Sequence, residues 1–474
     1  MCMKDKKILL NYSNCMDDII GPRHGISRMK LQEFSHQYLD ARMKIVSKRN
    51  SGKLGFMDLP FDDEMLKNIK RMAAQYKNKF QNLVVIGIGG SALGTIAVQT
   101  ALQHPFWNQL SDIERKKFPK IYVTDNIDPE RIQQLAGMLD MKKTLFNVIS
   151  KSGSTAECIA NYFVFKHQLI KRVGKKQYVK HIVITTDQKK GFLREHAQAE
   201  KIPTLPVPDN VGGRFSVLSP VGLFPCALTG IDVDSMVSGA RAMHERCETN
   251  ELQKNCAGVF GLINYLMYQA HKRICVFMPY SDQLKDMADW YRQLWAESLG
   301  KRTNNDNVPV YVGPTPVKAL GVTDQHSQIQ LYTEGPNDKI IVFVSVEKHT
   351  TTVPVHAPTG HYLKGKSMNT LFHAEELATR AALTKHERPN MSIIIPEITA
   401  STIGQLIYML ELATAYAGEF FCINAYDQPG VELGKQYTFA LIGRKGYENQ
   451  RKELEVFTKG EKKARGTKTC PFVA

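Results

Sequence analysis

The chain has 474 residues, of which 43% are hydrophobic and 23% charged, and its formal net charge is +16. This length predicts roughly two or three domains with cores of their own, and the composition excludes a disordered or fibrous protein. No apolar run reaches the about 18–20 residues that a membrane span requires, and residues 1–15 lack the apolar stretch of a signal peptide. We therefore expect a cytoplasmic protein without a membrane partner.

Along the chain, short apolar runs alternate with helix-length amphipathic segments. The strand candidates are 82–88, 121–124, 145–149, 181–185, 274–278, 340–346 and 391–395. The helix candidates are 64–80, 155–171, 282–299, 367–384 and 399–420. This alternation predicts an α/β fold built from doubly wound parallel sheets, in which ligands bind at the carboxyl ends of the strands.

One stretch rich in proline and glycine, residues 205–222, interrupts the alternation and is interpreted as a loop between two halves. The predicted organisation places an N-terminal segment at 1–50 and a first α/β domain at 51–230. A second α/β domain follows at 231–450, and a basic tail at 451–474 is expected to form a solvated, frayed end.

The positive charge would attract nucleic acid or small phosphorylated molecules alike. No zinc-finger spacing or aromatic RNA-binding motif accompanies it, so we predict no nucleic acid partner. The nine cysteines are scattered and none is spaced as CxxC, which predicts reduced thiols rather than disulfides or a zinc site.

The stretch VVIGIGGSALG, residues 84–94, passes from an apolar run through a glycine-rich turn into the start of a helix. A dinucleotide fingerprint is met by Gly87 and Gly89, but the acidic residue expected about 20 positions on is missing. A nucleoside triphosphate loop is excluded, since no Gly-Lys-Ser/Thr follows. The remaining interpretation is a turn whose backbone N–H groups, at Gly90 and its neighbours, hold one anion together with Ser91.

A second loop of this kind is ISKSGSTAE, residues 149–157, which also follows an apolar run and opens a helix. It gathers a lysine and four hydroxyl groups, from Ser150, Lys151, Ser152, Ser154 and Thr155. One hydroxyl would suffice to cap the helix. The additional donors favour a site for a monophosphate group over a simple cap.

Two longer stretches, DNVGGRFSVLSPVG (209–222) and YDQPGVELGK (426–435), resemble the signature stretches of the glucose-6-phosphate isomerase family. The glycine loop, the serine-rich loop, AESLGK (296–301) and QH (325–326) follow in the family's order. The resemblance covers about residues 50 to 445. It implies two sugar-isomerase-type α/β domains and reversible isomerisation of glucose 6-phosphate and fructose 6-phosphate, in glycolysis and gluconeogenesis.

Moving a proton between C2 and C1 of a sugar phosphate requires a base and a charge that stabilises the enediolate. The resemblance implies that Glu297 is the base, that Arg214 stabilises the enediolate, and that Gln293 lines the substrate site. Helical spacing places Gln293 and Glu297 on one face. Without the resemblance, the local pattern favours a solvent-exposed glutamate at a helix end for Glu297. The pattern around Arg214 is then as typical of a surface turn as of a binding site.

The remaining roles also come from the resemblance alone. It implies that Lys435 and His326 open the sugar ring, that Gln428 contacts the phosphate, and that Glu157 orients the histidine. Because the family takes this histidine from a neighbouring subunit, a homodimer with a shared active site is expected. No cofactor and no metal is expected, since the sequence lacks HExxH and any compact Cys/His cluster.

Four positions depart from the family's usual residues without removing a group that the chemistry needs, namely Thr95, Ser152, Ser154 and Leu299. Two alternatives stay open. One is an isomerase that also accepts mannose 6-phosphate, and the other is a sugar-phosphate sensor that binds without turnover. A sensor has no need of the glutamate, arginine, histidine and lysine together.

Overall fold

The computed structural model describes residues 7–466, with side chains through residue 458. The described chain separates into two compact units, one that ends at Ala425 and one that begins at Tyr426. The larger unit contains both parallel sheets, and each unit is described by itself below.

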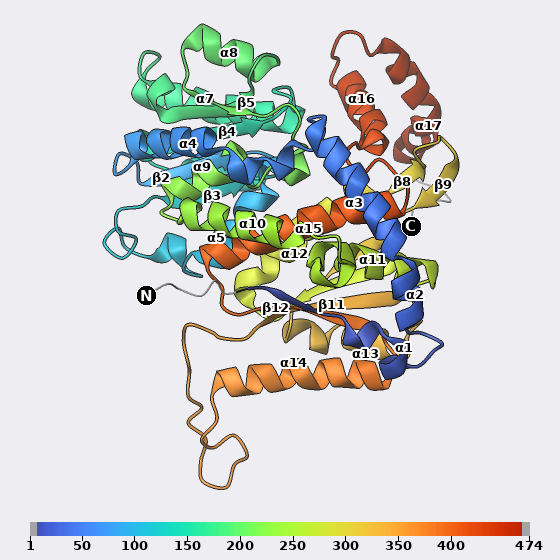
Figure 1. Ribbon diagram of the computed structural model, residues 1–474. Helices are drawn as coiled ribbons and strands as arrows, with labels where there is room; N and C mark the ends of the chain where they lie inside the picture. The colour runs from blue at the N-terminus through green and yellow to red at the C-terminus, as the bar shows by residue number, and fades with distance from the viewer. Residues whose placement is uncertain (1–6, 467–474) are drawn as a thin grey trace. The chain divides into compact units, whose positions relative to one another are not determined.

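The first sheet has five parallel strands in the order β3–β2–β4–β5–β6 (Figure 1). They are β2 (Asn82–Ile86), β3 (Lys120–Thr124), β4 (Thr144–Ser150), β5 (Ile182–Asp187) and β6 (Thr204–Val207). Every residue of the central strand β4 is buried. Such burial is expected of a parallel sheet that is covered on both faces, and it explains the continuous apolar runs in the sequence.

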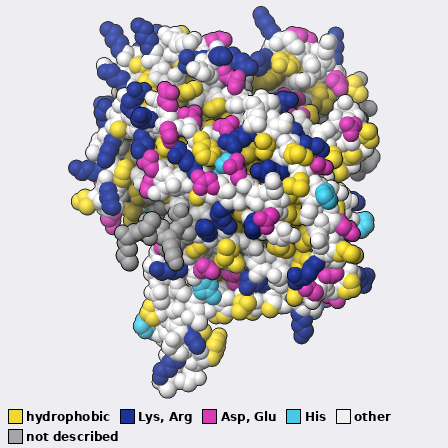
Figure 2. Space-filling view, viewed as in Figure 1, with side chains coloured by type: hydrophobic (Ala, Val, Ile, Leu, Met, Phe, Trp, Pro, Cys, Tyr) yellow, Lys and Arg dark blue, Asp and Glu magenta, His cyan; other side chains and the backbone are white. Residues whose placement is uncertain are grey.

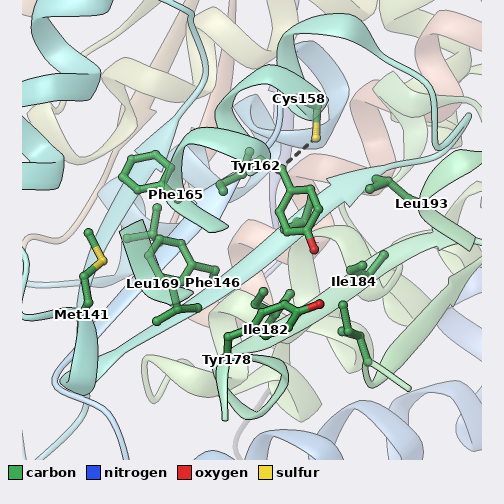
Figure 3. Packing of buried hydrophobic residues seen from close by; sticks show 14 of the residues in the cluster. Met141, Phe146, Cys158, Tyr162, Phe165, Leu169, Tyr178, Ile182, Ile184 and Leu193 are labelled. Atoms are coloured by element: carbon green, nitrogen blue, oxygen red, sulfur yellow. Dashed lines mark hydrogen bonds between the residues drawn. The ribbon is translucent and has the colours of Figure 1, made fainter. Parts of the chain in front are cut away.

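Helices cover both faces of this sheet. They are α4 (Asp63–Tyr76), α5 (Leu93–Leu102), α6 (Pro129–Met138), α7 (Ala156–Val173), α8 (Phe192–Glu200) and α9 (Pro220–Leu228). On one face Tyr162, Phe165 and Leu169 of α7 pack on Phe146 and Ile182 of the strands (Figure 3). This packing fixes the position of α7, and therefore holds the serine-rich loop at the carboxyl end of β4.

The loop predicted for 205–222 is only partly correct. Residues Thr204–Val207 form β6, and Pro220 begins α9. Pro206 is compatible with β6 because this strand lies at the edge of the sheet. An edge strand has a neighbour on one side only, so a residue without an N–H donor is tolerated there. Pro220 likewise stands at the first position of a helix, where its fixed φ is favourable.

A third proline, Pro225, lies inside α9 and leaves the carbonyl of Val221 without its usual helical donor. The hydroxyl of Thr95 donates to this carbonyl oxygen at 3.3 Å. The threonine that departs from the family's usual residue therefore satisfies a buried backbone acceptor and ties α5 to α9.

The second sheet has the order β1–β12–β11–β7–β10. Its strands are β1 (Leu9–Asn11), β7 (Ile274–Pro279), β10 (Thr315–Lys318), β11 (Lys339–Val346) and β12 (Asn390–Ile395). All neighbours are parallel except β1, which pairs antiparallel with β12. A separate two-stranded ribbon consists of β8 (Lys301–Thr303) and β9 (Pro309–Val312). The predicted α/β class with two parallel sheets is confirmed.

The helices of the larger unit outside the first sheet include one that is buried on all sides. They are α1 (Asp17–Ile20), α2 (Arg28–Glu33), α3 (Ser35–Asn50), α10 (Val233–Cys247), α11 (Cys256–Gln269), α12 (Lys285–Leu299), α13 (Ile329–Glu334), α14 (Met368–Lys385) and α15 (Ala400–Phe420). Helix α15 is predominantly apolar, is buried around its circumference, and packs against α3, α10, α11 and α12. Figure 1 shows it running between the two sheets.

The second unit contains α16 (Glu432–Leu441) and α17 (Glu448–Gly466). The predicted frayed tail is therefore helical through Gly466, and its remainder, 467–474, lies outside the described residues. The predicted domain boundaries at 50, 230 and 450 stay predictions.

The thiols and charges agree with the expectations from composition as far as the chain is described. Seven cysteines are free, six of them buried, while Cys2 and Cys470 lie outside the described residues. Figure 2 shows basic side chains spread over the visible face with acidic ones among them. Over residues 7–466, none of the helices combines the length and apolar character needed to cross a bilayer.

Candidate active site

The two predicted anion loops both begin at the carboxyl ends of neighbouring strands in the first sheet. Strands β2 and β4 are parallel neighbours with Ile86 opposite Val148, and Ser150 of β4 lies opposite Thr186 of β5. The glycine loop begins after Ile86 and the serine-rich loop after Ser150. The carboxyl ends of parallel strands are where ligands bind in such sheets.

The glycine loop packs directly against the backbone of the segment that carries Arg214. A Cβ atom on Gly90 would lie 2.2 Å from the carbonyl carbon of Gly213, and one on Gly89 would lie 2.9 Å from Nε2 of Gln293. Gly89 also has φ +56°, which favours glycine. Glycine is required here because the loop approaches its neighbours so closely.

Arg214 is almost fully buried, at 3% exposure, in the turn Gly213–Phe215. Its Nε donates to Oγ of Ser298 at 2.7 Å, and its Nη2 donates to the carbonyl oxygen of Ala425 at 2.8 Å. Its Nη1 lies 3.3 Å from Oε2 of Glu297 and forms an ion pair with it. All three nitrogens of the guanidinium group thus have an acceptor, which fixes its plane.

Glu297 occupies the last turn of α12 and remains one-third exposed. Its Oε1 accepts a hydrogen bond from Nε2 of Gln293 at 3.1 Å, so the predicted shared helix face is confirmed. Lys301 donates from Nζ to the backbone carbonyl of Glu297 at 2.7 Å and so closes the end of the helix. Oε1 of Gln293 is buried and has no hydrogen-bond partner among the residues that the structure describes.

The hydroxyl groups of the serine-rich loop point toward one another. Oγ1 of Thr155 lies 2.9 Å from Oγ of Ser150 and 3.3 Å from Oγ of Ser152. Ser154 donates from its N–H to Oγ of Ser152 at 3.3 Å. Thr155 stands at the N-cap of α7, yet its side chain makes no capping hydrogen bond. The hydroxyls therefore form a cluster at the positive end of a helix dipole, which suits an anion better than a cap alone.

The ammonium group of Lys151 contacts the backbone of the segment that follows β6. Its Nζ donates to the carbonyl oxygen of Asp209 at 2.8 Å. Burial lowers the pKa of the Lys151 ammonium, while the nearby carboxylates of Asp209 and Asp187 act in the opposite direction.

The profile of the family described as phosphoglucose isomerase matches residues 67–460 of the chain. The chain belongs to the phosphoglucose isomerase family. A glucose-6-phosphate isomerase of Carboxydothermus hydrogenoformans is 47% identical over 427 residues, covering 89% of this chain and 92% of the relative. A glucose-6-phosphate isomerase of Thermus thermophilus is 38% identical, covering 84% and 93% of the two chains.

Solved structures share the fold of this chain. A hypothetical protein from Thermus thermophilus matches with a TM-score of 0.82 and 36% identity, over 92% of this chain and all of that one. A glucose-6-phosphate isomerase from Chlamydia trachomatis has a TM-score of 0.73 at 24% identity, over 83% of this chain and 76% of that one, and shows the shared fold.

The structure brings together only part of the residue set that the family resemblance implies. Arg214 and Gln293 each contact Glu297, close to the glycine loop. The ring-opening candidate His326 lies exposed at the end of the turn Thr323–His326. Within the described chain, neither hydrogen bond nor ion pair joins it to Glu157, which is half-buried in the first turn of α7.

Lys435 and Gln428 belong to the second unit of the chain. Lys435 is exposed on α16 and donates from Nζ to Oε1 of Glu432 at 2.8 Å. Gln428 is exposed immediately before the turn Pro429–Val431. Their roles toward the site of the larger unit stay predictions.

The sequence interpretation missed two acceptors of Arg214, the hydroxyl of Ser298 and the carbonyl of Ala425. Ser298 is next to the predicted base, but the sequence around a serine in a helix does not indicate which side chain its hydroxyl will contact. Ala425 acts through its backbone, which no side-chain motif can reveal. Among the described residues, no three His, Cys, Asp or Glu side chains are arranged to hold a metal ion.

Proposed function

We propose that the chain interconverts glucose 6-phosphate and fructose 6-phosphate by proton transfer through a cis-enediolate. The observation that carries this proposal is the contact of Glu297 with a buried arginine, Arg214, next to two anion-type loops. Membership in the phosphoglucose isomerase family and the named relatives support the same reaction.

In this reaction Glu297 removes the proton from C2 of the open-chain aldose and returns it to C1. Its one-third exposure leaves an oxygen accessible to substrate, while Gln293 and Arg214 orient the carboxylate. Arg214 keeps its charge throughout the physiological pH range, so it stabilises the negative charge that develops on the enediolate oxygens. The unpartnered Oε1 of Gln293 supplies an acceptor for a sugar hydroxyl.

The phosphate group is proposed to bind the serine-rich loop after β4, and Gly90 and Ser91 are proposed to contribute from the turn that follows the neighbouring strand β2. The hydroxyls of Ser150, Ser152 and Thr155 supply the donors around a monophosphate. Lys151 could join them by leaving the carbonyl of Asp209, and Gln428 is proposed to add a further contact.

Ring opening is proposed to require a homodimer. His326 is exposed, as expected if the histidine serves a second copy of the chain. In that arrangement Glu157 of one copy orients His326 of the other, and Lys435 assists at the ring oxygen. No metal or other cofactor takes part in the proposed steps.

The reaction is tested by following the appearance of glucose 6-phosphate from fructose 6-phosphate in the presence of EDTA. We expect rapid conversion. Sugar-phosphate binding without conversion would instead indicate a sensor, and activity that returned only with added metal would contradict the proposed mechanism. Supplying mannose 6-phosphate in a parallel assay decides whether the enzyme also accepts that epimer.

The shared active site predicts complementation between two inactive variants. Co-expression of His326→Ala with Glu297→Gln should restore about a quarter of wild-type activity, because half of the dimers are mixed and each mixed dimer has one intact site. The measurement is kcat per protomer of the co-purified protein, with dimer formation checked by its mass in solution. If each site uses its own chain's histidine, the mixture stays inactive.

A further inference from the structure

Ser298 is the neighbour of the proposed base in α12, and its side chain is fully buried. Its Oγ accepts the hydrogen bond from Nε of Arg214 at 2.7 Å, a shorter contact than those described above for Nη1 and Nη2. The preceding residue, Glu297, accepts a hydrogen bond from Nη1 of the Arg214 guanidinium group at 3.3 Å. Two consecutive residues of one helix therefore hold one arginine from two of its nitrogens.

The geometry matters because a guanidinium group stabilises developing charge only if its N–H groups point at the place where that charge appears. The bond at Nε restricts rotation of the planar group about the bonds of its flexible side chain. The carbonyl of Ala425 holds Nη2 and Glu297 holds Nη1, and both contacts lie at the outer end of the group. The hydroxyl of Ser298 holds Nε, the nitrogen next to the aliphatic chain, by the shortest of the three contacts.

We propose that Ser298 is a positioning residue of the isomerisation: its hydroxyl orients Arg214 so that Nη1 faces Glu297 and the enediolate. The inference rests on the proposed function. Ser298 itself is buried behind Arg214 and acts through it, without touching the substrate. Nothing in the loop motifs or in the helical spacing assigns this role, which depends on a contact across 84 residues of sequence.

The test compares Ser298→Ala with a matched control in the second sheet. Oγ of Ser392, buried in β12 of the second sheet, accepts a hydrogen bond from Nη1 of Arg380 at 3.0 Å, so Ser392→Ala removes the same kind of contact from an arginine that is not part of the proposed site. For Ser298→Ala we expect kcat to fall about 10- to 100-fold with a small change in KM, since a misplaced group acts mainly in the transition state. Ser392→Ala should leave kcat unchanged.

Two further measurements separate positioning from a general loss of packing. Ser298→Thr keeps the hydroxyl and should recover most of the lost kcat. Ser298→Ala should also bind a phosphorylated aldonate, whose carboxylate imitates the enediolate charge, more weakly by a factor that parallels its loss of kcat/KM. The melting temperature of each variant is measured so that only folded proteins are compared.

An unchanged kcat in folded Ser298→Ala, or equal losses in Ser298→Ala and Ser392→Ala, would overturn the positioning role. A threonine variant that folds and remains as impaired as the alanine variant would also contradict it. If the wild-type protein itself does not isomerise the substrate, the proposed function fails first, and that result is distinguishable because it precedes any comparison of variants.

Discussion

Replacing Glu297 with glutamine is expected to lower kcat by about 10²- to 10⁴-fold, the range typical of losing a general acid–base group. The amide preserves the size of the side chain, and its single oxygen can still accept a hydrogen bond from Arg214 in place of Oε2. It cannot take up the C2 proton. KM should therefore change little, because the sugar phosphate is held mainly by the loops and not by the base.

The measurement is steady-state kinetics in both directions, together with exchange of the C2 proton of the substrate with solvent. Glu248→Gln is the matched control, because Glu248 also pairs with an arginine, Arg49, at 3.7 Å but lies at the C-terminal end of α10, outside the proposed site. The control should retain wild-type kcat. Turnover of Glu297→Gln close to that of the wild type would show that another group is the base.

Replacing Arg214 with lysine is expected to lower kcat/KM by about 10²- to 10³-fold, comparable to the loss of a charge-stabilising donor elsewhere. A lysine keeps the positive charge but has a single nitrogen at the end of a flexible chain. It cannot reach Ser298, Glu297 and the carbonyl of Ala425 together, as the guanidinium group does at 2.7, 3.3 and 2.8 Å. The loss should appear mainly in kcat.

Arg380→Lys provides the matched control for this change. Arg380 also contacts a serine, Ser392, and a glutamate, Glu376, at 3.0 and 3.5 Å, but in α14 and β12 of the second sheet. Both lysine variants should lose some stability, which thermal unfolding measures, and only Arg214→Lys should lose catalysis. Equal kcat values for the two variants would contradict the role of Arg214 in stabilising the enediolate.

The sequence alone determined those features that depend on neighbours along the chain. The apolar runs predicted the central strands of both sheets, because a strand buried on both faces requires an uninterrupted apolar stretch. The four-residue spacing of Gln293 and Glu297 predicted that they share one helix face, and in the structure their side chains are hydrogen-bonded. The long motifs indicated the phosphoglucose isomerase family before any contact was known.

Tertiary structure alone decided the features that join distant segments. Strand β1 is only three residues long and exists because β12 offers it an edge, and β6 tolerates Pro206 because it lies at the end of its sheet. The acceptors of Arg214 come from α12 and from the residue that ends the larger unit. Local periodicity indicates which face of a helix or strand is buried, but it does not indicate which other element packs on that face. The contact of the Ser298 hydroxyl with Arg214 could therefore be identified only from the tertiary structure.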